Sequence, residues 1–417
     1  MKKSGKGLCM TALAVVVVIT FLAGCAPSGG TTTSNAEQPG VVNIIMTAPL
    51  SGMLASFGQE QQEGVQMAVD EINAAGGVKV AGKNYLIKLT VMDDEFDASK
   101  GEDEVDMMLE KLTPKPVFYW CGSDVVGKVI MDENEKENLI MEIVSSDKAV
   151  VSTGNKLLTT TGHDIRDVAK GFANITYDDL GCKKAIMLCG DDPSSTLYRD
   201  QWIETYKSKG GQLLDSIDVD LFSTTDFYPF LTKAIAENPD VISTFASADS
   251  LVLMMTQAQQ LGYKGKWVFG DVTEVGEVLH LIPAKAMQTM GTFCGVAAYE
   301  TATLPEGQQT RFRAHIKKFH DKYGADKLWG SIVTNPYELC YAFKYAMEKT
   351  GTTTDAYAIR AAMADAVPVP EGVYPFYKIN PDGSGEYCEF ANICTNGVMG
   401  NSMVLYGDPS IAPKTSE

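Results

Sequence analysis

From residue 41 onward, the chain alternates short apolar runs with longer segments of helical period. Intervals of about 20 to 40 residues separate the first runs, and each interval is long enough for one helix. These runs are VVNIIM, LIKLTVM, PVFYWC and LIMEIV. Such alternation is typical of βαβ units and indicates a mostly parallel sheet. In the first interval, apolar residues within 65–75 recur at the spacing of one helix face, and the glycine pair at 76–77 supplies the stop.

A second series of the same kind begins after LTTTGHD. The two series hold too many strands for one compact sheet, so we expect an α/β fold with two lobes, each built on a parallel sheet. The predicted strands of the second series are KKAIMLC, QLLDSIDVDL, DVISTFA and KWVFG, with helices near 195–209, 227–238 and 249–262. The rest of the chain predicts helices over 307–323, 336–350 and 353–364, and a hairpin in which YPFYKI and GEYCEFANIC flank the turn NPDGSG.

The first 40 residues predict export rather than a folded domain. A basic start is followed by MTALAVVVVITFLA, which is short for a membrane span, and residues 1–24 therefore read as a signal peptide. Its ending LAGC resembles the bacterial lipobox, in which Cys25 becomes the acylated first residue; an ordinary signal peptide with a chance cysteine is the alternative. Residues 25–40 are rich in Gly, Ser, Thr and Pro and predict a flexible linker. We expect an extracytoplasmic protein, tethered by lipid to a bacterial membrane.

The charge of the chain limits its partners. Asp and Glu number 53 and Lys and Arg 35, which gives a formal net charge of -18. This charge repels phosphate backbones, so nucleic-acid binding is not expected and the partner is predicted to be small and neutral or cationic.

The nine cysteines do not indicate a disulfide framework. Seven remain after Cys9 and Cys25 are set aside, which is an odd number. Two of the remaining pairs bracket predicted strands, whose ends lie ~20 Å apart, while a bridge needs Cα atoms within ~7 Å. We predict mostly buried free thiols.

Motifs for catalysis and for cofactors or metals are missing. The stretch APLSGMLASFG leads from a strand into a helix but lacks the lysine of a P-loop and the G-x-G-x-x-G spacing, and no G-x-S-x-G elbow occurs. The acidic cluster MDDEFD lacks EF-hand spacing and reads as a solvated turn. The histidines are scattered through the chain, at His163, His280, His315 and His320. No cofactor, metal site or enzymatic activity is therefore predicted.

Small polar residues follow the predicted strands. Ligands of open parallel sheets bind beyond the carboxyl ends of the strands, where loops lead into helices. Free N–H groups and hydroxyls there suit a carboxylate, and an acidic residue suits an ammonium group. Helix capping is the alternative role for each of these residues. They are Pro49, Ser51, Gly52, Trp120, Gly122, Ser123, Ser145, Ser146, Asp147, Ser247, Gly270 and Asp271.

The segment APLSGMLASFGQEQQEGVQMAVDEINAAGG resembles the opening of the branched-chain amino-acid type of periplasmic binding protein. It contains a strand end, P-x-S-G, an aromatic–glycine pair and G-x-x-x-A-x-x-x-I-N-x-x-G-G. Later landmarks of that family are matched by TVMDD, DLGCKKAIMLCGDD, STTDFYPFLTKAIAENPDVI and AQQLGYKGKWVFGD. The resemblance covers roughly residues 41–300 closely and the remainder by pattern.

The resemblance implies the type I fold, with two Rossmann-like lobes, three hinge crossings near 163, 289 and 367, and closure of the lobes on a ligand. It also implies a monomer that delivers a small molecule to the permease subunits of an ABC importer. A sensing receptor of the same fold and a secreted α/β enzyme are the alternatives. The implied lobes are 41–162 with 289–367, and 163–288 with 368–417.

The resemblance also assigns ligand contacts. Phe57 would line the site, Asp271 would pair with an α-ammonium group, and the loops Cys121-Gly122-Ser123 and Ser145-Ser146-Asp147 would grip a carboxylate. Asp147 departs from the family, which commonly has Thr or Ser there, and a carboxylate would repel that of an amino acid. Weaker candidates for contacts are Trp120, Tyr198 and Ser247. An amino acid or related small polar molecule is expected, with an amide, a urea-like compound or an aromatic acid as alternatives.

Overall fold

Two mixed sheets organise the chain in a computed structural model that describes residues 38–221, 223–270, 274–297, 308–325, 327, 329–373 and 376–407. The predicted signal peptide, most of the linker, Cys25 and Asp271 lie outside these residues. Pro39 begins the compact folded unit. In the part of the chain that the structure describes, every helix falls short of the length and apolar character that a membrane crossing requires.

The first sheet has six strands in the order β2-β3-β1-β4-β5-β6. All neighbours are parallel except β2 and β3, which form an antiparallel hairpin. Strand β1 pairs with β3 from Gly40 opposite Tyr85 to Ala48 opposite Asp93. The strands are β1 (Gly40–Ala48), β2 (Val78–Val80), β3 (Lys83–Asp93), β4 (Phe118–Cys121), β5 (Ile140–Ile143) and β6 (Leu158–Thr159).

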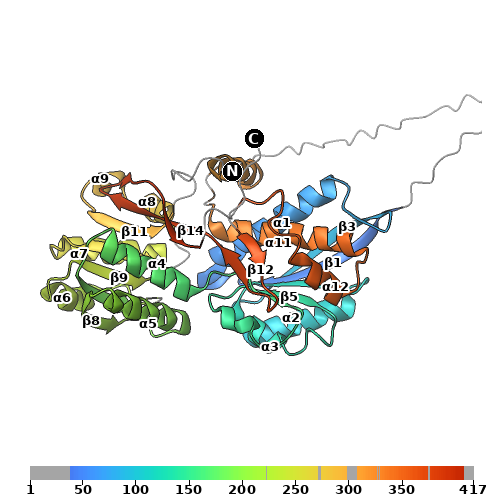
Figure 1. The fold of residues 1–417 in the computed structure, drawn as a ribbon, viewed down its shortest axis with the longest axis horizontal. Coiled ribbons are helices and arrows are strands. Elements are labelled where there is room, and N and C mark those ends of the chain that lie inside the picture. Colours follow the sequence, from blue (N-terminus) through green and yellow to red (C-terminus); the bar gives the residue numbers. More distant parts are fainter. Residues whose placement is uncertain are drawn as a thin grey trace, which may run out of the picture. The chain divides into compact units, whose positions relative to one another are not determined.

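Helices cover both faces of this sheet, and the side chains of β1 alternate between them (Figure 1). Ile44 and Met46 pack in the cluster that contains residues of α1 and α11, whereas Ile45 packs with α2 and α3. Burial on both faces explains why the strand reads as one continuous apolar run. The helices are α1 (Ala55–Ala74), α2 (Ala98–Lys111), α3 (Asp124–Ile130), α11 (Ser331–Thr350) and α12 (Ala356–Met363), with 3-10 turns η1 (Gly52–Leu54) and η2 (Lys148–Val151).

The second sheet has eight strands, in the order β15-β14-β11-β10-β9-β7-β8 with β16 paired to β14. The neighbours from β11 to β8 are parallel, and β14 is antiparallel to β11. The strands are β7 (Lys184–Cys189), β8 (Gln212–Asp218), β9 (Val241–Phe245), β10 (Lys266–Gly270), β11 (Thr292–Val296), β14 (Glu389–Thr395), β15 (Val398–Met399) and β16 (Met403–Tyr406).

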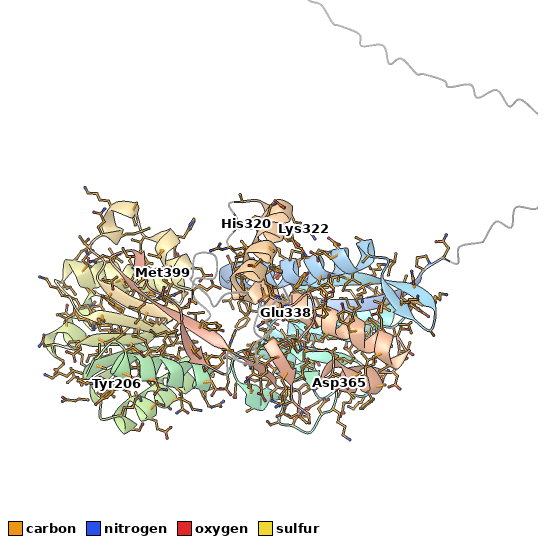
Figure 2. The ribbon with its side chains drawn as sticks, turned by 45° about the horizontal axis from the view of Figure 1, so that its top comes forward. Tyr206, His320, Lys322, Glu338, Asp365 and Met399 are labelled. Atoms are coloured by element: carbon orange, nitrogen blue, oxygen red, sulfur yellow. The ribbon has the colours of Figure 1, made fainter. Side chains whose placement is uncertain are left out.

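Two layers of helices enclose the second sheet. Helices α4 and α5 share a core cluster with Met187 and Val268, and α6, α7 and α8 share another with Ile186 and Phe269. Tyr206 of α5, labelled in Figure 2, is fully buried and stacks on Trp202 with ring centroids 4.6 Å apart. The helices are α4 (Ile165–Asp178), α5 (Pro193–Ser208), α6 (Tyr228–Ala236), α7 (Ala248–Gln260), α8 (Val275–Leu281) and α9 (Ala284–Met287). Helix α10 (Gln308–Tyr323) lies against α1 of the first sheet instead, where Lys318 pairs with Glu71 and Lys322 with Asp70.

The predicted strands and helices are confirmed with small shifts of their ends, but sheet membership differs from the predicted division into lobes at two places. Strand β11 lies after the crossing predicted near 289, yet it pairs with β10 and β14 in the second sheet. The hairpin of β12 (Phe376–Ile379) and β13 (Gly385–Tyr387) lies after 367, yet a bridge joins Ser384 to Thr160 beside β6. The exact lobe boundaries remain a prediction.

The segment GEYCEFANIC contains two strands rather than one. Strand β13 pairs with β12, and β14 joins the second sheet after a break at the buried residue Cys388. This break lies near the first connection between the sheets, because His163 Nδ1 is 3.2 Å from Glu389 Oε2. Burial lowers the pKa of His163 to about 3 and raises that of Glu389.

The prediction of free thiols is confirmed for all seven cysteines that the structure describes, each of which is buried. Burial raises the pKa of the Cys121, Cys189 and Cys340 thiols to about 12. These groups behave as small apolar side chains in the core.

Candidate functional site

The carboxyl ends of β1 and β4 form the switch point of the first sheet, because β3 lies on one side of β1 and β4 on the other. The Gly122 N–H donates to Thr47 O at 2.8 Å. A β-carbon on Gly122 would lie 2.7 Å from Ala48 Cβ. Glycine is therefore required for the two strand ends to approach this closely.

Trp120 lies beneath this edge and does not offer a surface to a ligand. Its residue is 1% exposed, and its indole N–H donates to Gln61 Oε1 at 2.8 Å. Gln61 Nε2 in turn donates to Gly122 O at 3.1 Å. The Trp120 side chain thus packs in the core instead of facing a ligand, and its hydrogen bond to Gln61 supports the turn at Gly122.

Several predicted serines cap helices or turns, as the alternative interpretation expected. Ser123 Oγ accepts from Val126 N–H at 3.5 Å, and Ser145 Oγ accepts from Asp147 N–H at 3.1 Å. On the second sheet, Ser247 begins α7 and its Oγ accepts from Ser250 N–H at 3.5 Å. A hydroxyl that accepts one hydrogen bond can still donate its own hydrogen, so capping does not prevent ligand binding.

Asp147 is paired with an arginine that sequence reasoning missed. Arg166 Nη1 lies 2.9 Å from Asp147 Oδ1 and 3.3 Å from Asp164 Oδ1. Burial opposes ionisation of Asp147, but hydrogen bonds from Arg166 and from Ala149 N–H outweigh it and lower the pKa of the carboxyl group. Arg166 is shared between Asp147 and Asp164, so the negative charge at this departure from the family is partly offset. No local pattern in the sequence reveals this pair, because the partners stand on two sides of a sheet-to-sheet connection.

The strand ends of the second sheet are capped in a similar way. Asp192 begins α5 and accepts from Ser195 N–H at 3.0 Å. In the same turn of α5, Ser194 Oγ lies 2.9 Å from Ser146 Oγ, which follows the end of β5. The strand ends of the two sheets are thus in direct contact at this point.

Tyr198 lies under the end of β10 and, like Trp120, belongs to the core. Its ring is fully buried 5.4 Å from that of Phe245, and its hydroxyl lies 3.4 Å from Ser243 Oγ. A β-carbon on Gly270 would lie 2.0 Å from the Tyr198 ring. The weak prediction of Tyr198 as a ligand contact is not supported, because Gly270 covers the ring.

Phe57 is partly exposed in the first turn of α1, which begins earlier than the sequence predicted. The helix starts close to the end of β1, since a β-carbon on Gly58 would lie 2.2 Å from Pro49 O. Phe57 therefore remains available to line a site, whereas Asp271 lies outside the described residues.

An acidic region lies one helical turn further along α1. The position of a β-carbon on Gly330 would be 2.8 Å from Glu60 Oε2 and 3.7 Å from Glu277 Oε1 of α8. Burial raises the pKa of Glu60 to about 8, with Glu277 and Glu63 adding to the effect and Lys327 opposing it. Within the described ranges, no group of three or more His, Cys, Asp or Glu side chains could hold a metal ion.

Comparisons with known proteins agree with this architecture. A family model described as periplasmic binding protein matches residues 41–390. Leu/Ile/Val-binding protein homolog 8 of Brucella abortus (strain 2308) is 26% identical over 306 residues, which cover 69% of this chain and 71% of that protein.

Solved structures show the same fold. The branched-chain amino acid transporter substrate binding protein LivJ from Streptococcus pneumoniae, in complex with isoleucine, has a TM-score of 0.69 at 18% identity and covers 87% of this chain and 99% of its own. A solute binding protein of an ABC transporter from R. palustris, in complex with benzoate, has a TM-score of 0.68 at 15% identity and covers 91% and 98%. The chain therefore belongs to the periplasmic binding protein family, and its fold is the type I fold of these solved relatives.

Proposed function

We propose that this protein captures a small carboxylate-bearing molecule between the strand ends of its two sheets and delivers it to the permease of an ABC importer. The observation that carries this proposal is the Ser146–Ser194 contact, where polar strand ends of the two sheets meet at 2.9 Å. Two relatives with the same fold hold isoleucine and benzoate, which have a carboxylate in common. An amino acid is the first candidate ligand, and an aromatic acid is the second.

The loops at the ends of β4 and β5 would hold the carboxylate. Ser123 and Ser145 are buried beside the edge, at 3% and 5% exposure. The Ser123 hydroxyl can turn toward an acceptor, and that of Ser145, which donates to Asp147 O at 3.3 Å, would exchange this contact for the ligand. Ser123 precedes the first turn of α3, where backbone N–H groups favour a negative charge. The repulsion expected from Asp147 is partly offset by Arg166, which supports an anionic ligand at this loop.

Selectivity would come from the rest of the proposed site. Phe57 is the wall of the site, and Asp271, if the ligand is an amino acid, pairs with its ammonium group. Amides and urea-like compounds remain alternatives because they can use the same hydroxyls without a charge.

A thermal-shift screen tests the proposal directly. The folded unit from Pro39 onward would be heated with amino acids, aromatic acids, amides and ureas in separate wells. A ligand at 100 times its dissociation constant should raise the free energy of unfolding by ~2.7 kcal/mol. Ser123→Ala should weaken the response to a carboxylate ligand, while Ser208→Ala, at the end of α5 where the exposed hydroxyl donates to Thr205 O, serves as the matched control. A flat response to all four classes would contradict the small-solute proposal.

The lipid tether forms a separate part of the proposal and rests on the LAGC ending. Cys25→Ser should release the exported protein from the membrane fraction, because the acylated residue is lost. Cys9→Ser, within the predicted signal peptide, is the matched control and should leave the protein with the membrane. Membrane retention of the Cys25→Ser variant would remove lipidation at this residue from the proposal.

A further inference from the structure

The loop from Ser145 to Asp147 in the first sheet contacts the elements of the second sheet at three points. Ser146 Oγ lies 2.9 Å from Ser194 Oγ, and Asp147 Oδ1 lies 2.9 Å from Arg166 Nη1. The backbone also takes part, since Ile165 N–H donates to Ser146 O at 2.9 Å. We call the side chains of Ser146, Asp147, Arg166 and Ser194 the inter-sheet latch.

Arg166 is fixed to the second sheet by its own helix. It lies in the first turn of α4, where its N–H donates to the N-cap Asp164 at 2.9 Å. The carboxylate of Asp164 also pairs with the guanidinium group, with Oδ1 3.3 Å from Arg166 Nη1. The buried residues Val168 and Phe172 of α4 pack in the core of the second sheet. The guanidinium group is therefore presented to the first sheet from a rigid support.

Asp147 is equally well fixed to the first sheet. Its Oδ1 accepts from Ala149 N–H at 3.0 Å and caps η2, and its backbone N–H donates to Ser145 Oγ. One carboxylate oxygen thus joins the turn after β5 to an arginine of the other sheet. A relative movement of the sheets that separates these elements has to break this ion pair.

We propose that the inter-sheet latch favours the arrangement seen here, in which the strand ends of the two sheets are in contact, before a ligand binds, and that Arg166 is a positioning residue for the loop 145–147. We call this arrangement closed. The consequence for ligand capture rests on the proposed function, but the latch itself does not. The two side chains of the ion pair are 32% and 35% exposed, so solvent weakens the attraction. We therefore expect a change of about two- to five-fold in the ratio of closed to open molecules when the pair is removed.

Distance measurements between spin labels test the latch without any ligand. One label is attached at Asp365→Cys, which follows α12 beside the first sheet, and the other at Val398→Cys in β15 of the second sheet. Figure 2 labels Asp365 and Met399, the neighbour of Val398. Both positions are exposed, at 68% for the Asp365 side chain and 73% for Val398. All described native thiols are buried, so the introduced cysteines should react first.

Pulsed electron resonance on this labelled full chain, in which Cys9→Ser and Cys25→Ser remove the two thiols outside the described residues, should then separate the variants. Asp147→Asn and Arg166→Gln should each broaden the distance distribution, with a two- to five-fold larger open population, and the double variant should add little to either. Arg166→Lys, which keeps the charge, should recover part of the closed population. Arg199→Gln is the matched control, because Arg199 pairs with Asp218 at 2.9 Å within the second sheet's own elements.

Unchanged distributions in Asp147→Asn and Arg166→Gln would overturn the latch, as would fully additive effects in the double variant. If a variant does not fold, the wild-type chain still gives an answer. Salt added from about 0.05 to about 0.5 M should open it, because an exposed ion pair is screened. A latch that fails while the ligand screen succeeds leaves the proposed function intact, and a flat ligand screen leaves the latch result standing.

Discussion

Elements of the two sheets face each other in two regions of opposite electrostatic character. At the inter-sheet latch, Asp147 meets Arg166, and opposite charges attract. Near Gly330, Glu60 of α1 and Glu277 of α8 point at the same position, and like charges repel unless a proton intervenes. The attraction at the latch therefore stabilises this arrangement of the sheets, whereas the acidic pair near Gly330 makes its stability depend on the protonation of Glu60.

The largest expected effect comes from Glu60. Its pKa is raised from 4.5 to about 8 in this structure, so the folded state binds more protons than the unfolded state between these two values. The free energy of unfolding should therefore fall as pH rises through this window, by up to about 1.4 kcal/mol per pH unit. Urea titrations at several pH values measure this slope. Glu60→Gln should make this slope shallower by one proton's share, while Glu102→Gln, an exposed change on α2, should not. Part of the slope should persist, because burial also raises the pKa of Glu142 to about 7 and that of Glu389.

A slope as steep in Glu60→Gln as in the wild-type chain would mean that Glu60 does not carry the proton. The proposed repulsion between Glu60 and Glu277 would then be contradicted, while the conclusions about the latch would stand.

An intermediate effect is expected from Glu277→Gln. Burial is the larger cause of the raised pKa of Glu60 and Glu277 the second, so the midpoint of the pH dependence should move below 8 and stay above 4.5. Glutamine can keep the hydrogen bond from Glu274 N–H to Glu277 Oε2, which preserves the start of α8. The same urea titrations report the midpoint. A midpoint that does not move would show that the two carboxylates do not interact across the sheets.

The smallest effect, a few tenths of a kcal/mol, is a difference in salt dependence between two variants. At about pH 9, where Glu60 is ionised, salt should weaken the attraction at the latch and the repulsion near Gly330 at once. It also screens the self-repulsion of a chain with a net charge of -18, in every variant alike. Relative to the wild-type chain, salt should therefore stabilise Glu60→Gln less and Asp147→Asn more. Equal responses of the two variants would contradict the contrast between the regions.

The sequence predicts the elements of this fold better than the partners of its side chains. Strands such as β1 and β4 are buried on both faces, so each stands out as an apolar run whatever its neighbours are. The pairing of β11 with β14 joins residues about a hundred positions apart, and no local pattern specifies it. The same limit explains why the crossing predicted near 289 differs from the observed end of the second sheet.

The candidate site follows the same rule. Gly122 and the capping serines could be located because a strand end followed by a helix start is a local signal. Trp120 is predicted as a contact because it lies at a strand end, and Tyr198 because the family has an aromatic residue near the start of that helix. In the structure Trp120 donates to Gln61 instead, and Tyr198 lies under Gly270. Arg166 was missed because its role depends on a partner across the connection. The ligand residues themselves stay a prediction.

The break at Cys388 also sets the kinematics of the molecule. Each peptide unit contributes only two soft torsion angles, and a single residue separates β13 from β14. The contact of His163 with Glu389 places the first connection beside this one. At these two connections, a rotation of one sheet relative to the other must therefore be absorbed by a handful of bonds.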